Sequence, residues 1–548
     1  MRNLVVIVLA LVLTVSAASQ PPAAAILAEH VPSDVLMYVE FSVSGSTIQG
    51  IDSLIANLSD RIGVEAPPTF DGIVQILGLR AWLGGRGALA VLPAASLYGL
   101  QRNAVGLLQI RDRAAVESYL VDGAQAMPVP NTRGDWSIFV LNGISISVSD
   151  NLVVAAVGLA GATLPGPNGP SLATHQPYLD AMAALPGEDY AATAYLDPQG
   201  LVFAAAGMAT EVFDAAAVNL PALSDSLGVV GAGLSQLDDR TYALDIAHLY
   251  GSRHLFEALY APVPPVISVE PIDPDWLSLL PDDVAFAGQT TGAWSQLRTL
   301  LEALSIGGNA IQTRALVNSR LFEDMTGVDP VSSPLAFLPP SLTSAGILNT
   351  LEGLLDLSDA ELSAAFDGQA AVALRLRESA SAPALDTLLA VESSGLDAGH
   401  KVLNGVRSLL PLLNLSPVEA GDDLMIFAAP GGAYESRLEL LADYNALYFG
   451  SESLILAGKE TLIAVPRLTE SEPFIHDRAW FLPGATNLAY IHLPPLRAMF
   501  GLRSERGGLL LPDSVELRNL VDSFDSFWIS GRTEPGRSIL RAAFTLTE

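Results

Sequence analysis

Short words in the first half of the chain recur in the second half in the same order, and this repetition constrains the fold more than any other feature. The phrase "VPSDVLMYV" at 31–39 returns as "LPDDVAFAG" at 280–288. Four further pairs follow in order: 83–91 with 366–374, 149–155 with 451–457, 175–201 with 472–496, and 228–250 with 526–548. Any one pair could arise by chance in a chain rich in Ala, Leu and Val. Five pairs in one order indicate an internal duplication.

The repetition predicts the domain boundaries. We expect a first repeat over 26–263 and a second over 276–548, joined by a linker at 264–275. The linker lies in "APVPPVISVEPIDPD", whose prolines favour an extended, semi-rigid conformation. The spacing between paired words rises over the first pairs, from 249 residues (31 to 280) to 283 residues (83 to 366), and this early rise predicts an insertion in the second repeat near 305–355.

The N-terminus has the order of a secretory signal. Arg2 precedes an apolar run from Leu4 to Val15, and small residues follow at 16–18. This order predicts a signal peptide over 1–18 and an exported, extracytoplasmic protein. The run is short for a spanning helix, which favours a cleaved signal over the alternative, an uncleaved N-terminal membrane anchor. No other segment is expected to span a membrane, because Glu211 and Asp214 interrupt the best candidate, 201–220, which is expected to be a buried amphipathic helix.

The charge balance limits the classes of partner. The chain carries 59 acidic and 28 basic residues, a formal net charge of −31. This charge repels the phosphate backbone, so no nucleic-acid partner is expected. A well-hydrated acidic surface explains it, and a cationic partner or a metal is the alternative. The absence of cysteine excludes disulfides, thiolate nucleophiles and iron–sulfur clusters.

Local patterns predict the elements of each repeat. Turns at Asn142-Gly143 and Asp150-Asn151 predict a three-stranded meander over 136–158, and the second copy repeats it over 424–458. Apolar residues at helical spacing predict amphipathic helices over 46–63 and 292–308. The predicted fold class is therefore α+β: two tandem copies of an antiparallel sheet with helices packed on one face.

The openings "VPSDVLMYVEF" and "LPDDVAFAGQ" resemble a family of bacterial exported proteins, domain of unknown function 3352. Its members open with a Leu/Val-Pro-x-Asp strand after an N-terminal apolar segment. The resemblance covers most of the mature chain and implies export. It brings no activity and no catalytic residues. This chain departs from the anchored members in that its N-terminal segment is typical of a cleaved signal.

The sequence offers no convincing catalytic, cofactor-binding or metal-binding residues. None of the seven histidines has ligand spacing: His30, His175, His248, His254, His400, His476 and His492. The glycine-rich "WLGGRGALA" at 82–90 predicts a strand start or tight bend. The acidic pairs in "PDDV" (281–284) and "GEDY" (187–190) predict turns, and "DLSDAE" (356–361) predicts a helix cap by Ser358 or Asp359. The tripeptide RGD at 133–135 is more simply a chance loop sequence than an adhesion motif.

These observations leave three hypotheses for function. The first is a non-enzymatic exported module that binds a hydrophobic, lipid-like or other small ligand. The second is a structural or protein-interaction protein of the cell envelope, with the 305–355 insertion as its contact loop, and the third is an unrecognised hydrolase. An enclosed apolar cavity would favour the first, a large exposed apolar patch the second, and convergent Asp, Glu and His side chains the third.

Overall fold

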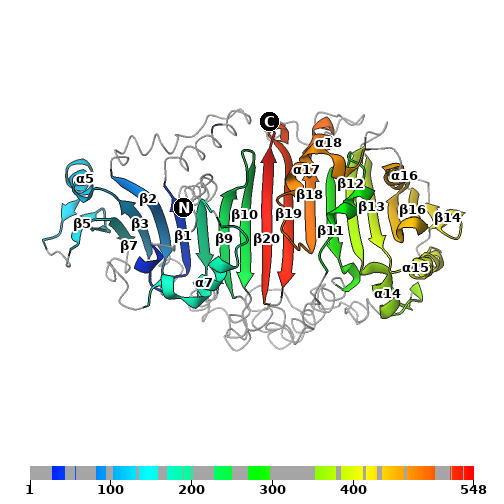
Figure 1. The fold of residues 1–548 in the computed structure, drawn as a ribbon, viewed down its shortest axis with the longest axis horizontal. Coiled ribbons are helices and arrows are strands. Elements are labelled where there is room, and N and C mark those ends of the chain that lie inside the picture. Colours follow the sequence, from blue (N-terminus) through cyan, green and yellow to red (C-terminus); the bar gives the residue numbers. More distant parts are fainter. Residues whose placement is uncertain are drawn as a thin grey trace, which may run out of the picture. The chain divides into compact units, whose positions relative to one another are not determined.

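The chain divides into two compact units in the computed structural model (Figure 1). Unit 1 comprises Met1–Leu255 and Gly536–Glu548, and unit 2 comprises Phe256–Pro535. The structure describes residues 27–43, 56, 82–93, 103–130, 135–157, 170–188, 190–198, 200, 228–249, 270–295, 352–353, 355–377, 384–410, 415–428, 435–461, 466–499, 519, 521–534 and 536–547.

Unit 1 is built on antiparallel strands. Its described strands are β1 (Met37–Ser42), β2 (Leu83–Val91), β3 (Ala104–Ile110), β4 (Met127–Pro128), β5 (Ser137–Leu141), β6 (Ile144–Val148), β7 (Leu152–Val157), β8 (Ala192–Leu196), β9 (Val229–Gln236), β10 (Thr241–Leu249) and β20 (Arg537–Leu546). Their order across the sheet is β4-β5-β6-β7-β3-β2-β1-β8-β9-β10-β20. The final strand of the chain therefore completes unit 1.

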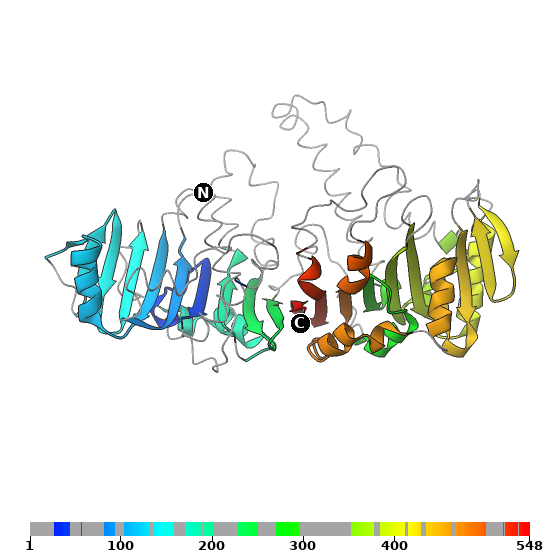
Figure 2. The same ribbon diagram turned by 90° about the horizontal axis from the view of Figure 1, so that it is seen from above.

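The described helices of unit 1 are short and lie beside this sheet. They are η1 (Ala28–His30), α5 (Arg113–Ser118) with the π-helical turn η3 (Tyr119–Gly123), η4 (Leu172–Thr174) and α7 (Gln176–Ala183). Figure 2 shows α5 in cyan alongside the neighbouring strands. Tyr178 of α7 packs edge-on against Tyr38 and Tyr195 of the sheet. On the opposite face, Val116 and Leu120 of α5 and η3 share a core with Phe139 and Ile146.

Unit 2 has β11 (Phe286–Thr291), β12 (Gln369–Arg377), β13 (Ala384–Glu392), β14 (Ser416–Ala420), β15 (Leu424–Ala428), β16 (Glu435–Leu441), β17 (Ala446–Ser451), β18 (Asn487–His492) and β19 (Phe524–Glu534). Their order is β14-β15-β16-β17-β13-β12-β11-β18-β19, and every pair is antiparallel. The described helices are η5 (Pro274–Leu279), α14 (Asp359–Phe366), α15 (Leu396–Leu409), η9 (Ala442–Tyr444), α16 (Glu452–Thr461), η10 (Leu468–Glu470), α17 (Glu472–Arg478) and α18 (Leu493–Met499).

The two units share one strand order. The order β14 to β19 in unit 2 repeats the order β4 to β9 in unit 1 strand for strand. The two repeated opening phrases also make equivalent backbone contacts. Pro32 forms an isolated antiparallel bridge with Ser171, and Pro281 forms one with Arg467. This topology supports a duplication. The boundaries 26–263, 264–275 and 276–548 describe sequence repeats rather than compact units, and they stay predictions.

One of the five sequence pairs is wrong as a structural match. "SDNLVVA" at 149–155 forms a turn and the start of β7, whereas "SESLILA" at 451–457 forms the first turns of α16. The strand of unit 2 that takes the place of β7 is β17, which ends at Ser451 where that word begins. The two words are alike because both are apolar, and not because they occupy the same position.

The predicted fold class is also wrong. Hydrogen bonds join the twenty described strands in a single antiparallel sheet rather than two tandem sheets. Among the described residues, helices are fewer than strands and lie on both faces of the sheet. In unit 2, α15 packs on Leu438 and Leu440 of β16, while Lys459 of α16 reaches Glu439 on the opposite face of the same strand. Repeated words in a sequence indicate which segments correspond to each other. They do not indicate whether a strand of one repeat pairs with a strand of the other.

The first predicted meander is confirmed, and the second is confirmed up to Ser451, where helix α16 replaces the end of the predicted range 424–458. Asn142 and Gly143 adopt φ values of 50° and 82° in the turn between β5 and β6, which these residue types tolerate. The sequence Asp150-Asn151 turns the chain into β7, and β15, β16 and β17 form the second meander. Several predicted segments lie outside the described residues: 1–18, 201–220, all of 46–63 but residue 56, most of 292–308 and nearly all of 305–355.

One end strand of each unit carries a proline. Among the described strands, β4 pairs only with β5, and β14 pairs only with β15. Strand β4 ends at Pro128, and β14 contains Pro417 beside an irregularity between Pro417 and Glu419. Proline has no N–H to donate to a further strand. None of the helices in the described ranges is long and apolar enough to cross a membrane.

The aromatic core beneath α17 yields a prediction for stability. The Phe474 ring is fully buried between Phe481 and Tyr490, with ring centroids 5.7 and 5.1 Å away. Phe474→Ala should lower the free energy of unfolding by about 3 to 5 kcal/mol, because it leaves a cavity. The neighbouring Ile475 is 58% exposed, so Ile475→Ala is the matched control and should change it little. Equal losses in urea denaturation would contradict the packing.

Candidate functional site

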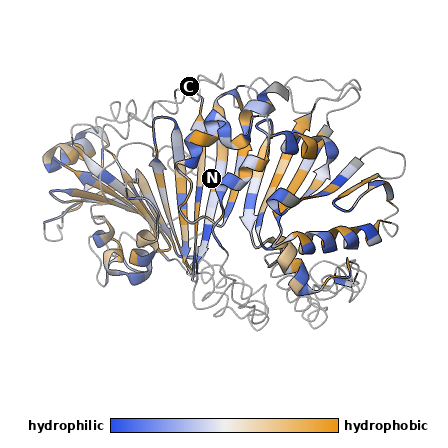
Figure 3. Cartoon of the chain, turned by 45° about the vertical axis from the view of Figure 1, so that its right-hand side comes forward, coloured by the Kyte–Doolittle hydropathy of each residue, from blue (hydrophilic) through white to orange (hydrophobic). Residues whose placement is uncertain are grey.

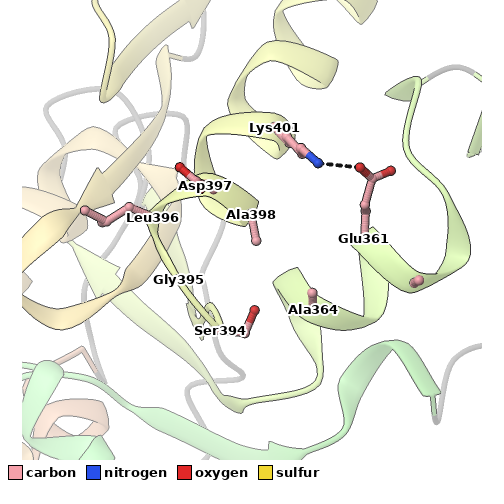
Figure 4. A pocket seen from close by; sticks show the side chains of 9 residues that line it. Glu361, Ala364, Ser394, Gly395, Leu396, Asp397, Ala398 and Lys401 are labelled. Carbon is pink, nitrogen blue, oxygen red and sulfur yellow. Dashed lines mark hydrogen bonds and ion pairs between the residues drawn. The ribbon is translucent and has the colours of Figure 1, made fainter.

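A hollow of about 600 Å³ lies between α14 and α15 (Figure 4). Helix α14 begins with a capping box: the Ser358 hydroxyl accepts a hydrogen bond from Glu361 N, and the Glu361 carboxylate accepts one from Ser358 N. Ser358 is one of the two residues predicted to cap this helix. Most of the lining residues are small. The lining consists of Ala360, Glu361, Ala364, Ser394, Gly395, Leu396, Asp397, Ala398 and Lys401. The hollow is open and not an enclosed apolar cavity.

One ion pair spans this hollow. Lys401 Nζ lies 2.5 Å from Glu361 Oε1. The hydrogen bond from Lys401, together with those from Ser358, lowers the pKa of Glu361 to about 2. Both groups are exposed, so the pair contributes little to stability. The lining holds one hydroxyl and no histidine, which leaves no nucleophile with a partnered base.

A second cluster joins Ser, Asp and His side chains beneath α17. Tyr490 Oη donates to Asp477 Oδ2 at 3.1 Å, Ser526 Oγ donates to the same oxygen, and His476 Nδ1 lies 3.2 Å from Asp477 Oδ1. Burial and the nearby Asp477 raise the pKa of Tyr490. In a catalytic triad the imidazole lies between serine and carboxylate. Here the carboxylate lies between them, and Ser526 is fully buried. The cluster anchors α17 to the sheet.

Charged side chains beside α16 are also paired. Arg375 Nη2 donates to Asp386 Oδ2 at 3.0 Å, and Ser453 Oγ of α16 donates to the same atom at 2.7 Å. Glu439 accepts from Arg437 at 2.8 Å and from Lys459 of α16 at 2.6 Å. These bonds satisfy charges that the sheet buries and hold α16 in place.

The residues singled out in the sequence do not converge. His492 ends β18 and is buried, His400 of α15 pairs with Asp423 in the turn before β15, and His254 lies outside the described residues. No group of three His, Asp or Glu side chains suited to a metal occurs in the described ranges. "PDDV" forms the predicted turn, where burial raises the pKa of Asp282, and β2 begins in "WLGGRGALA" as predicted, with an irregularity between Leu83 and Gly87. Of RGD, only Asp135 is described.

The main candidate is an exposed apolar surface on unit 2, which we call the apolar face. A row of directly paired residues crosses six strands: Phe449 (β17), Leu389 (β13), Val372 (β12), Gly288 (β11), Ala489 (β18) and Ile529 (β19). Phe449, Leu389, Val372 and Ile529 are 37–44% exposed. Leu385 and Ile491 add to the same face at 55% and 37%. Figure 3 shows hydrophobic residues running along these strands.

Gly288 keeps the middle of the row shallow. A Cβ at this position would lie 2.9 Å from Val372 Cγ1 and 3.4 Å from the Phe286 ring, so a larger residue would push these side chains aside. With strands about 4.8 Å apart, the row is roughly 24 Å long. Exposed apolar patches of this kind mark surfaces for protein or membrane contact.

The row continues under α15. Leu438 of β16 pairs with Phe449, and Leu438 is buried against Val402 and Leu403 of α15. The basic residues of α15 meet acidic or carbonyl oxygens of unit 2. His400 lies 2.7 Å from Asp423 Oδ1, Lys401 pairs with Glu361, and Arg407 donates to the Gly421 carbonyl. Part of this face is thus covered by a helix with an apolar stripe and basic flanks.

Sequence reasoning missed this face. A signal was present, since β12 reads "QAAVALRLR" and β13 reads "ALDTLLAVE", with apolar residues on both faces rather than strict alternation. Such runs predict burial on both sides. The degree of exposure depends on neighbours distant in the sequence.

Comparisons with known proteins add no function. No family model matches the chain, and no curated protein matches it. Solved structures of TP0453 are similar to part of it. Crystal form III has 11% sequence identity, covers 43% of this chain and 82% of that one, and has a TM-score of 0.24. Crystal form I gives 11%, 43%, 81% and 0.22. Similarity at this level carries no argument about fold or activity.

The buried His492 yields a pH prediction. Burial lowers the pKa of this imidazole below its ordinary 6.5. The unfolded chain therefore binds a proton below pH 6.5 that the folded chain does not, and the free energy of unfolding falls as pH drops through that range. His492→Gln should lose part of this slope between about pH 8 and about pH 5.5, measured by denaturation. His30, whose pKa burial also lowers, keeps a remainder. An unchanged slope would contradict the assignment.

Proposed function

We propose that this protein is a non-enzymatic, exported binding protein of the cell envelope, and that its apolar face binds an amphipathic helix of a partner protein. The observation that carries the proposal is the row of paired, exposed apolar side chains from Phe449 to Ile529. Six large apolar residues on one sheet face are costly to leave in water, at about 25 cal/mol per Å² of apolar surface.

The form of the surface favours a macromolecular partner over a small ligand. Sites for small molecules are concave and bury most of the ligand. The hollow beside Lys401 is open and lined by small side chains, and the apolar face is a row on a sheet. The second sequence-based hypothesis, a protein-interaction role, therefore has more support than the first, ligand binding. Neither the cluster around Asp477 nor the one around Asp386 supplies an accessible nucleophile for the third.

The kind of helix follows from α15. That helix covers the adjoining part of the same row with Val402, Leu403 and Val406, and it directs basic side chains at acidic groups of unit 2. The chain's net charge of −31 also attracts cationic partners at long range and so speeds their encounter with the protein. We therefore expect the partner helix to carry an apolar stripe flanked by Lys or Arg.

Binding of designed peptides to the full chain tests this function. The probe is a Leu/Lys amphipathic peptide of about 18 residues, roughly 27 Å long as a helix and comparable with the row. Leu389→Glu or Ile491→Glu should each weaken its binding by about tenfold or more, because a carboxylate then lies in an apolar contact. Val418→Glu is the matched control, since Val418 of β14 is 60% exposed away from the face, and it should change little.

Two further probes define the outcomes that count against the proposal. A Leu/Glu peptide with the same apolar stripe should bind more weakly than the Leu/Lys peptide at low salt, and the difference should shrink as salt increases. Equal binding by both peptides would contradict the charge argument. Binding of phosphatidylcholine vesicles without peptide binding would replace the protein partner with a membrane. Failure of every probe would contradict a binding role for the apolar face.

A further inference from the structure

Nine residue pairs join β10 to β20, and their register is symmetric. Thr241 pairs with Thr545 at one end and Leu249 with Arg537 at the other, so the middle pair is Asp245 with Arg541. Strand β10 ends the first sequence repeat, and β20 ends the second. Two corresponding strands of the duplication therefore pair antiparallel about one central residue in each.

The central pair is buried and bidentate. Arg541 Nε donates to Asp245 Oδ1 at 2.6 Å, and Nη2 donates to Oδ2 at 2.8 Å. Tyr190 Oη donates to Oδ2 at 2.8 Å and accepts from Gly187 N at 2.6 Å. Asp245 is fully buried, and Arg541 is 8% exposed. Arginine and carboxylate match in this geometry, so the contact is specific as well as attractive.

The flanking pairs are less selective. The Tyr242 and Phe544 rings stack with centroids 5.4 Å apart, and the Thr241 and Thr545 hydroxyls lie 3.3 Å apart. Aromatic and threonine pairs stabilise many strand pairings. The central Asp245–Arg541 pair therefore determines which strand β10 pairs with.

If the same strand of two molecules paired, the attraction between opposite charges at the central position would become a repulsion between like charges. In the observed register, β10 against a second β10 places Asp245 opposite Asp245, and β20 against a second β20 places Arg541 opposite Arg541. Two like charges buried together are strongly unfavourable. A symmetric pairing is the one arrangement in which a central residue meets its own copy.

We infer that the Asp245–Arg541 pair selects the strand that β10 accepts. The edge of β10 is an interaction surface that fits a strand with a central arginine, here β20 of the same chain, and rejects the edge of a second copy of β10. The pair thereby keeps the corresponding strands of a duplicated protein from joining molecules together.

Three full-length variants test this inference: Asp245→Arg, Arg541→Asp, and the double exchange Asp245→Arg/Arg541→Asp. Each single variant places like charges at the buried centre and should lower the midpoint of thermal unfolding by about 10 °C, as expected when a buried pair is broken in a unit of this size. The double variant restores opposite charges and should recover most of that loss as a monomer. Single variants as stable as the wild type, or a double variant no more stable than the singles, would overturn the inference.

Mixing the single variants tests partner choice directly. Refolded separately, each should stay monomeric, because its free β10 and β20 edges repel their like. Refolded together, β10 of the Asp245→Arg chain matches β20 of the Arg541→Asp chain in charge, and each chain completes its partner. We expect a heterodimer by light scattering after size exclusion, and none when either variant is refolded with wild type. Homodimers of a single variant, or a mixture that stays monomeric, would each overturn the inference.

Discussion

The antiparallel pairing of β10 with β20 is the contact on which unit 1 depends. The ion pair at its centre joins residues 296 apart in the sequence. Unit 1 therefore cannot finish its sheet until the C-terminal strand has been made and has returned to β10. Closing so long a loop costs conformational entropy before any contact repays it, and contacts distant in sequence slow folding. The stacked rings and the bidentate ion pair offset that cost at one place.

The two faces of unit 2 differ in how they are stabilised. One face buries tyrosine, tryptophan and paired charges beneath α16 and α17, and the charged clusters described there are held by hydrogen bonds. The other face carries exposed aliphatic and phenylalanine side chains, and among the described helices α15 packs on its β15 and β16 end. The first face stabilises the fold, whereas the second has apolar side chains that are exposed to solvent. The proposed binding role rests on this contrast.

The sequence was informative where a local rule decides the structure. Asn142-Gly143 predicts its hairpin because both residues accept positive φ, and Ser358, one of the two residues predicted to cap a helix, forms that N-cap. It failed where similar apolar words have different contexts. "SDNLVVA" has Asp and Asn for a turn, whereas "SESLILA" begins with Ser and Glu, which suit the first turn of a helix. The single sheet and the exposure of Leu389 and Ile491 depend on neighbours that no local pattern identifies.

The prolines of β4 and β14 have a consequence for the protein at high concentration. An open antiparallel sheet is a template for its own growth, and apolar strands stacked edge to edge lead toward fibrils. Pro128 and Pro417 withhold the donor that the next strand would need, and the irregularity beside Glu419 disturbs the register at the second end. Extensive β-structure is thus combined with strand edges that disfavour the addition of further copies.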